Sequence, residues 1–252
     1  MKIFVTGGTG YIGSHTVVEL QKNGYDVIIA DNLVNSSMDV LDGIEKISGI
    51  RPEFEEIDLT DGEVTRDFFA RHSDIRAVIH FAALKAVVES VYKPLEYYFN
   101  NLNSLMNVLT CMREFKVSNL VFSSSCTVYG QADVLPVTEK TPRHEAESPY
   151  GNTKVMSEDI IRDLMRVEPD MKALALRYFN PIGAHPTAFI GELPNGLPNN
   201  LIPYLTQTAI GIREQLSVFG DDYNTPDGSP LRDYIDVVDL AQAHVVAIRR
   251  LL

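Results

Sequence analysis

A glycine-rich turn near the N-terminus constrains the fold more than any other part of the sequence. The apolar run Lys2–Thr6 predicts a buried strand, which leads directly into Gly7-Gly8-Thr9-Gly10-Tyr11-Ile12-Gly13. A helical pattern follows as far as Asn23-Gly24, and a second apolar strand, Asp26–Ala30, ends at Asp31. This order of strand, glycine turn, helix, strand and acid is typical of a unit that binds a dinucleotide.

Each glycine of the turn has a separate expected role. Gly7 allows the tight turn, Gly10 lets a pyrophosphate approach the backbone, and Gly13 lets the helix lie close to the sheet. The spacing is G-x-x-G-x-x-G rather than G-x-G-x-x-G, so a plain strand–helix turn is the alternative. Asp31 can accept both ribose hydroxyls and would repel a 2′-phosphate, and residues 32–37 contain no Arg or Lys. We therefore expect NAD rather than NADP.

Composition narrows the class of partners. The 252 residues have a formal net charge of −12, which argues against nucleic acid or an anionic membrane as the main partner. Cys111 and Cys126 form no C-x-x-C pair, and the six histidines have no metal-binding spacing, so we expect neither a disulfide framework nor a metal site. The sequence shows no signal peptide and no apolar run of membrane-spanning length, which predicts a cytoplasmic protein.

Strand and helix patterns alternate along the first 180 residues. Such alternation predicts an α/β fold with a doubly wound, Rossmann-like parallel sheet, whose ligand lies beyond the carboxyl ends of the strands. The further strands are expected at Glu53–Ile57, Ala77–Phe81, Asn119–Ser123 and Ala173–Arg177, and the further helices near Ser36–Ser48, Asp61–His72, Pro94–Glu114 and Pro149–Arg166.

The character of the sequence changes after Asn180. Pro181–Pro203 and Gly220–Pro230 are rich in Pro, Gly and Asn and show little periodicity. Loops of this length are usually functional or disordered. We therefore expect residues 1–180 to form an NAD-binding domain and residues 181–252 a smaller substrate-binding region with segments that return to the main sheet. A flexible surface excursion is the alternative.

The second informative stretch is Ser148-Pro149-Tyr150-Gly151-Asn152-Thr153-Lys154. Ser148 is a favourable helix N-cap and Pro149 suits the first helical position, so a helix should begin here. Tyr150 and Lys154 then share one face of that helix. A surface aromatic–lysine pair is the alternative, but the dinucleotide turn upstream and the serines that end the strand Asn119–Ser123 favour a reaction centre.

Energetics explain why such a pair is useful. Holding a tyrosine of pKa about 10 in its ionised form at pH 7 costs about 4 kcal/mol. A lysine cation about 4 Å away supplies about 1 kcal/mol in water and about 4 kcal/mol in a partly buried site. The lysine and the positive charge of an oxidised nicotinamide together would make the tyrosine a base for reversible alcohol oxidation.

These motifs together resemble the extended short-chain dehydrogenase/reductase superfamily, and within it the family of UDP-glucose (UDP-galactose) 4-epimerases. The resemblance extends along essentially the whole chain. Besides the glycine turn, the serine and Y-x-x-x-K, it rests on Asp31-Asn32-Leu33, Phe81-Ala82-Ala83-Leu84-Lys85, Ser123–Gly130, Arg177–Gly183 and Arg232-Asp233-Tyr234-Ile235.

The resemblance implies a tightly held NAD that takes a hydride from C4 of the sugar and returns it to the other face of a transient 4-keto sugar. It assigns Tyr150 as the base on the 4-hydroxyl and Ser125 as a hydrogen-bonding partner of the reacting oxygen. Lys154 is implied to lower the tyrosine pKa and to hold the nicotinamide ribose. A homodimer formed through the helices Pro94–Glu114 and Pro149–Arg166 is also implied.

The resemblance also implies two sets of binding residues, although Asn100, Asn200, Phe179 and Phe219 have ordinary loop, cap or core roles as alternatives. The cofactor set comprises Gly7, Gly10, Tyr11, Ile12, Gly13, Asp31, Asn32, Leu33, Asn35, Ser36, Asp58, Leu59, Phe81, Ala82, Ala83, Lys85, Asn100, Ser123, Tyr150, Lys154 and Phe179. The UDP-sugar set comprises Lys85, Ser125, Tyr150, Asn180, Asn200, Leu201, Ser217, Val218, Phe219 and Arg232, with the Arg232 guanidinium as the natural diphosphate partner.

Two further features bear on the function. Sugar-nucleotide 4,6-dehydratases carry an acid pair just after the strand-end serine or threonine. Cys126 and Thr127 occupy these positions here, so dehydration is disfavoured.

The sequence ends at Leu252 in a predicted helix, Val238–Arg250, while family members continue for several dozen residues, so we expect an incomplete substrate region. Three functions stay open: a UDP-galactose/UDP-glucose 4-epimerase, an epimerase of another UDP-sugar, and an NAD-binding module without turnover.

Overall fold

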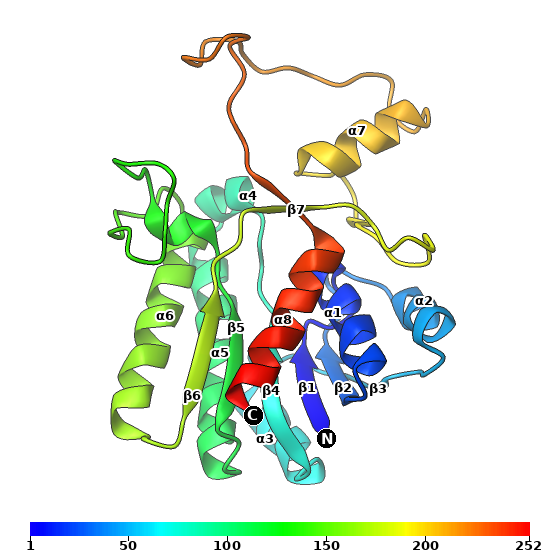
Figure 1. Cartoon of the computed structure of the whole chain (residues 1–252), viewed down its shortest axis with the longest axis vertical. Coiled ribbons are helices and arrows are strands. Elements are labelled where there is room, and N and C mark those ends of the chain that lie inside the picture. Colours follow the sequence, from blue (N-terminus) through cyan, green and yellow to red (C-terminus); the bar gives the residue numbers. More distant parts are fainter.

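The computed structural model describes all 252 residues and is built around one parallel sheet (Figure 1). The sheet has six strands in the order β3-β2-β1-β4-β5-β6. This order confirms the predicted doubly wound fold, and it reverses between β1 and β4, where open sheets of this type bind ligands. The strands are β1 (Lys2–Thr6), β2 (Asp26–Asp31), β3 (Glu53–Glu56), β4 (Ile75–His80), β5 (Asn119–Ser123) and β6 (Lys172–Leu176).

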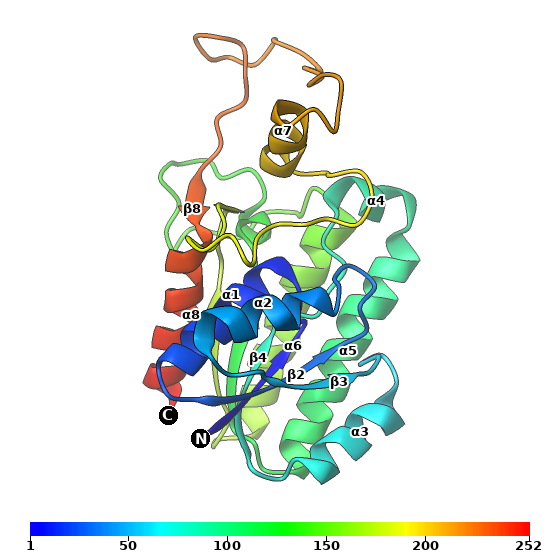
Figure 2. The same ribbon diagram turned by 90° about the vertical axis from the view of Figure 1, so that its right-hand side faces the viewer.

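Helices cover both faces of the sheet (Figure 2). One layer contains α1 (Tyr11–Lys22), α2 (Asp39–Ser48) and α8 (Val237–Leu251), and the other contains α3 (Gly62–Arg71), α5 (Pro94–Glu114) and α6 (Pro149–Val167). Because successive side chains of a strand point to opposite faces, β1 supplies Ile3 and Val5 to the first layer and Phe4 to the second. The sheet is therefore buried on both faces, as its nearly continuous apolar strands predict.

The elements that the sequence did not predict are short or pair over long distances. They are α4 (Val87–Tyr92), a 3-10 helix η1 (Cys126–Tyr129), α7 (Leu201–Ala209) and a separate two-stranded parallel sheet of β7 (Asn180–Ile182) and β8 (Tyr234–Asp236). Strands of three residues carry too little periodicity to be recognised.

The chain between β7 and β8 extends beyond the carboxyl ends of the strands and carries α7 (Figure 1). After β8 the chain returns to the main sheet as α8, which packs against α1 and β5. Pro203 is the one buried residue of α7. None of the helices has the length and apolar character that crossing a membrane requires.

Candidate active site

The glycine turn between β1 and α1 has room only for glycine at two positions. Gly7 lies in the left-handed region with φ +67°, and a Cβ there would lie 2.8 Å from the Ala82 nitrogen. A Cβ on Gly13 would lie 2.3 Å from the Gly7 oxygen, so α1 begins directly over the turn. Gly10 is the N-cap of α1, and no side chain caps the first N–H groups of the helix. Uncapped N–H groups at the positive end of a helix dipole suit a pyrophosphate.

Asp31 connects this turn to the loop that follows β2. Its Oδ2 accepts from the Thr9 N–H at 3.3 Å, and its Oδ1 accepts from the Leu33 N–H at 3.0 Å and from Ser36 Oγ at 3.3 Å. The Thr9 and Ser36 hydroxyls are 2.7 Å apart. The carboxylate is therefore held beside the turn, where the sequence predicts it. The neighbouring predicted residues Asn32, Leu33, Asn35 and Ser36 all lie in this loop.

The loop after β4 is fastened to the same turn. Thr6 Oγ1 accepts from the Phe81 N–H at 3.1 Å and the Ala82 N–H at 3.2 Å. Its own proton is then free to be donated to His80 Nδ1, 3.0 Å away. The predicted segment Phe81–Lys85 consequently lies against the glycine turn.

Asn101 is a buried residue of this region that the sequence analysis missed. It accepts from the Leu84 N–H at 2.8 Å and donates to the Leu84 carbonyl oxygen at 3.0 Å and to Thr153 Oγ1 at 3.2 Å. It thereby joins the β4 loop to α6. The predicted Asn100 donates to Asn101 Oδ1 at 2.9 Å. The signal was available, because Asn101 lies four residues after the buried Tyr97 on the inner face of α5.

The two predicted residues after β3 have different surroundings. Asp58 is a loop residue whose Oδ1 accepts from the Thr60 N–H and hydroxyl at 2.9 and 2.8 Å. Leu59 is buried in the core with Phe68 and Phe69. The Leu59 side chain is therefore occupied by packing. Its carbonyl oxygen accepts from Asn107 Nδ2 at 2.9 Å and from Thr65 Oγ1 at 3.3 Å, so only its N–H is left to face a ligand.

The three predicted catalytic residues come together where β5 ends against α6. Ser148 Oγ accepts from the Gly151 N–H at 3.1 Å, which confirms the predicted N-cap. Lys154 is 5% exposed, and its Nζ donates to the Ser123 carbonyl oxygen at 2.7 Å and lies 5.9 Å from the centroid of the Tyr150 ring. Ser125 caps η1 and accepts from the Thr127 N–H at 3.2 Å.

Burial decides the pKa values of both Tyr150 and Lys154 in the chain without cofactor. Burial raises the pKa of Tyr150 to about 12, against the opposing effect of the Ser125 hydroxyl. Burial lowers the pKa of Lys154 to about 8, against the opposing charge of Glu158. The Lys154 ammonium is directed at the Ser123 carbonyl, and loss of solvation is the largest effect on the Tyr150 pKa.

A second layer of aromatic residues supports this cluster. The Ser123 hydroxyl is hydrogen-bonded to the Tyr178 hydroxyl. The Tyr178 ring lies 6.1 Å from the ring of His244 in α8, which in turn lies 4.7 Å from Phe81. Burial raises the pKa of Tyr178 and lowers that of His244 to about 4, so both side chains are neutral near pH 7. Ser123 is thus held from both sides of the sheet, by Lys154 of α6 at its carbonyl and by Tyr178, which lies beside α8, at its hydroxyl.

The β7–β8 pairing brings two predicted substrate residues toward the cluster. Asn180 donates its side-chain N–H to the Asp233 carbonyl oxygen at 3.0 Å, and Phe179 precedes it. Burial raises the pKa of Cys126, which follows Ser125, against the hydrogen bond from the Ser125 hydroxyl, while the charges of Arg232 and Asp233 act on it in opposite directions. A raised pKa keeps the Cys126 thiol protonated near pH 7, so this cysteine is a poor nucleophile.

Other predicted substrate residues lie further out. Lys85 and Asn200 meet at Glu192, whose Oε1 is 3.5 Å from Lys85 Nζ and accepts from Asn200 Nδ2 at 2.6 Å. The sequence analysis did not name Glu192. Leu201 begins α7 and is exposed. Ser217, Val218 and Phe219 lie in the chain between β7 and β8, residues 183–233, which we call the projecting segment. Phe219 is 100% exposed, so the structure does not bring these three residues to the cluster. No group of three His, Cys, Asp or Glu residues lies close enough together to hold a metal ion.

Comparison with known proteins places the chain in a family. The family model described as "NAD dependent epimerase/dehydratase family" matches residues 3–251. The chain is 53% identical to the UDP-glucose 4-epimerase of Bacillus subtilis over 252 residues, which is 100% of this chain and 74% of that protein. It is 51% identical to that of Mus musculus, over 99% and 74% of the two proteins.

A solved structure agrees with these sequences. The UDP-glucose 4-epimerase of Bifidobacterium longum, in complex with NAD+ and UDP, has a TM-score of 0.96 and 47% identity, over 99% of this chain and 74% of that one. The chain thus spans about three quarters of the length of these relatives. Since the family model and the relatives match it from end to end, the chain belongs to the NAD dependent epimerase/dehydratase family.

Proposed function

We propose that this chain interconverts UDP-galactose and UDP-glucose at C4 of the sugar, with NAD as a resident hydride carrier. The observation that carries the proposal is the cluster of Tyr150, Lys154 and Ser125 beyond the carboxyl ends of β5 and β4, next to a glycine turn fit for a dinucleotide. Relatives more than 50% identical across the whole chain are UDP-glucose 4-epimerases.

The residues present fit NAD. Side chains at Gly7 and Gly13 would fill the turn, and the uncapped N–H groups at the start of α1 are suited to the pyrophosphate. Asp31 is suited to the adenosine ribose, and Lys154 to the nicotinamide ribose. When bound, NAD supplies the hydride acceptor and donor and, in its oxidised form, a positive charge.

Tyr150 moves the proton in this proposal. With a pKa of about 12, ionising the phenol at pH 7 costs about 7 kcal/mol. The Lys154 ammonium lies 5.9 Å from the centroid of the Tyr150 ring and is directed at the Ser123 carbonyl, so it offsets only part of this cost. With Lys154 as its only cation, Tyr150 therefore stays protonated. Additional positive charge is required before Tyr150 accepts the proton of the 4-hydroxyl. Ser125, whose hydroxyl is hydrogen-bonded to Tyr150, would donate a hydrogen bond to the reacting oxygen.

The UDP-sugar would lie between this cluster and the β7–β8 pair. Arg232 is the cation suited to the diphosphate, and Asn180 is held beside it by the Asp233 carbonyl. Lys85 and Asn200, joined through Glu192, would contact the sugar nucleotide from the loop after β4 and the start of α7. Leu201, Ser217, Val218 and Phe219 belong to the proposed site only if the projecting segment folds over the ligand.

We also propose a homodimer through α5 and α6. Leu95, Phe99 and Met106 lie on one face of α5 and are exposed, and Met156 of α6 is exposed as well. A patch of this kind on adjacent helices favours an interface with a second copy. Phe99→Asp should convert a dimeric mass in solution to a monomeric one, whereas a monomeric wild-type chain would exclude this part of the proposal.

The function is tested by adding UDP-galactose to the purified chain without added NAD and following UDP-glucose by NMR. Conversion that Tyr150→Phe abolishes supports the proposal. Absence of conversion in a folded chain that releases NAD on denaturation would instead support an NAD-binding module. Parallel reactions with UDP-N-acetylgalactosamine and UDP-glucuronate test whether another UDP-sugar is preferred.

A further inference from the structure

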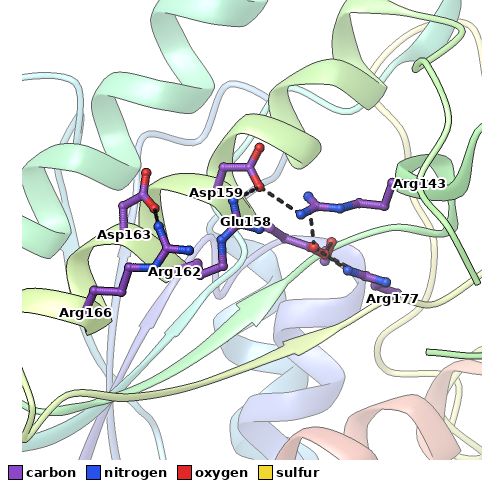
Figure 3. Close-up of polar contacts among 8 residues, drawn as sticks. Arg143, Glu158, Asp159, Arg162, Asp163, Arg166 and Arg177 are labelled. Atoms are coloured by element: carbon purple, nitrogen blue, oxygen red, sulfur yellow. Dashed lines mark hydrogen bonds and ion pairs between the residues drawn. The ribbon is translucent and has the colours of Figure 1, made fainter. Parts of the chain in front are cut away.

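Glu158 is a buried carboxylate directly behind the reaction cluster. It lies one helical turn after Lys154 on α6, and its side chain is 8% exposed. Its Oε1 accepts from the Ser124 hydroxyl at 2.6 Å and from Arg177 Nε at 2.8 Å, and its Oε2 accepts from Arg177 Nη2 at 2.6 Å. Figure 3 shows this carboxylate between Arg177 and Arg143, whose Nη1 is 3.7 Å away.

These contacts connect Glu158 to the segments on either side of Ser125. Ser124 directly precedes the proposed catalytic serine, and its hydroxyl has Glu158 as partner. Arg177 follows β6 and lies over the ring of Tyr129 in η1, 5.0 Å from its centroid. One carboxylate therefore holds the residue before Ser125 and, through Arg177, the short helix after it.

Glu158 also supplies negative charge to the surroundings of Lys154. From β4, Lys154 faces His80, which is neutral near pH 7 because burial lowers its pKa to about 3. From α6 it faces Tyr150, and through Ser123 it is linked to Tyr178, both kept neutral by raised pKa values. Glu158 is the acidic group that raises the Lys154 pKa against burial.

The carboxylate is ionised despite its position. Burial opposes ionisation, but the hydrogen bonds from Arg177 and Ser124 outweigh it and lower the pKa of Glu158. Its charge is therefore present throughout the neutral and alkaline range in which Lys154 titrates.

We propose that Glu158 is a positioning residue of the epimerase reaction, which supports the Lys154 ammonium and holds the Ser124–Ser125 segment against Tyr150. The inference deepens the proposed function and rests on it. Glu158 touches neither the cofactor nor the sugar and acts through its neighbours on α6 and β5.

The first test is the pH profile of kcat in Glu158→Gln. Removing the negative charge makes the Lys154 ammonium less favourable, so the Lys154 pKa falls. The alkaline limb of the profile, where kcat declines as Lys154 loses its proton, should therefore move to lower pH by about one unit. KM should stay within about twofold, because the residue does not contact the substrate. The Cε resonance of Lys154 in lysine-labelled protein, assigned with Lys154→Met, should titrate at the same lower pH.

Three variants separate charge from packing. Asp163→Asn is the matched control, because Asp163 lies on α6 in an exposed pair with Arg166 and should leave the profile unchanged. Ser124→Ala keeps the charge and removes the tether, so kcat should fall several-fold without a shift of the limb. Glu158→Asp should restore the position of the limb.

Stability of the variant is controlled separately. Glu158→Gln leaves Arg177 without its charged partner, so Glu158→Gln with Arg177→Met is made as a second form. An unshifted limb and an unshifted Lys154 resonance in Glu158→Gln, or in the double variant relative to Arg177→Met alone, overturn the proposal, as does failure of both forms to fold, which would make Glu158 a structural residue. If the wild type and Asp163→Asn turn over normally, the epimerase function is supported whether or not the alkaline limb shifts in the Glu158 variants. A wild-type chain without turnover counts against that function, while the Lys154 resonance still decides the role of Glu158.

Discussion

The cluster around Tyr150 and the segment between β7 and β8 differ in what holds them. Lys154 and Ser125 are buried and each is fixed by a hydrogen bond to a neighbouring element, and the glycine turn is packed against the β4 loop. The projecting segment has α7 with one buried residue and an entirely exposed Phe219. The cofactor side of the site is thus part of the protein core, whereas the substrate side depends on contacts that the core does not make. Substitutions in the first region should change stability or chemistry, and those in the second should change only substrate binding.

The largest effect is expected at the centre of the packed region. Tyr150→Phe removes the proposed acid–base group and should lower kcat about 1,000-fold. The bound NAD should be retained, since the turn, Asp31 and Lys154 are untouched. Steady-state kinetics measure kcat, and the NAD released on denaturation measures the amount of bound cofactor. Retention of more than a tenth of the wild-type kcat would remove Tyr150 from the proton transfer.

A matched glycine pair sharpens the comparison of the two regions. Gly13→Ala places a Cβ 2.3 Å from the Gly7 oxygen, a backbone atom with little freedom to move, and should lower the free energy of unfolding by about 3 kcal/mol. Gly220→Ala, in the projecting segment, meets only the Asp222 side chain at 3.2 Å and should change it by less than about 0.5 kcal/mol. Urea unfolding of both variants measures the difference. Equal effects would contradict the distinction between the two regions.

Acid should destabilise the packed region specifically. Burial keeps the pKa of His244 at about 4 in the folded chain, below the usual value of 6.5 for a histidine in water. The unfolded chain therefore binds more protons between these two values, and stability falls as the pH falls. The loss attributable to His244 between pH 7 and pH 5 should be about 2 kcal/mol. Urea unfolding of the wild type and of His244→Gln at both pH values measures it, and an equal pH dependence in the two proteins would show that His244 does not contribute.

The smallest effect is expected for Phe219→Ser. Because this side chain is fully exposed, the free energy of unfolding should change by less than about 0.5 kcal/mol. The KM for UDP-galactose should rise, since the ring is proposed to contact the nucleotide only once the segment folds over it. Initial rates over a range of UDP-galactose concentrations measure the KM, and thermal unfolding with and without UDP measures the stability. A loss of more than 1 kcal/mol without ligand would show that the segment is packed in the free chain.

The parts of the molecule that the sequence predicts are those with local signals. The glycine turn, Asp31 and the α6 N-cap at Ser148 each carry a recognisable residue pattern, and all three lie where they were expected. The helix Pro94–Glu114 and the strand Asn119–Ser123 have the predicted bounds. Long periodic segments and turn chemistry are encoded within a few neighbouring residues, which is why they are predictable.

What was missed depends on contacts between distant parts of the chain. Glu158 is a charged residue on a helix, and only the arrival of Arg177 and Ser124 makes it a buried partner. Asn101 becomes a link between the β4 loop and α6 only after both are in place. Spacing on a helix likewise does not reveal the Ser123 carbonyl at which Lys154 is aimed.

The most direct measurement of the central claim follows a deuterium label at C4 of UDP-galactose, with the chain as purified and no added NAD. If the packed region holds NAD as a hydride carrier that acts within one turnover, the UDP-glucose formed should retain the deuterium at C4 without exchange into water. Formation of unlabelled UDP-glucose, or release of deuterium to solvent, would contradict this account, because the hydride would then not return from the site to the carbon it left.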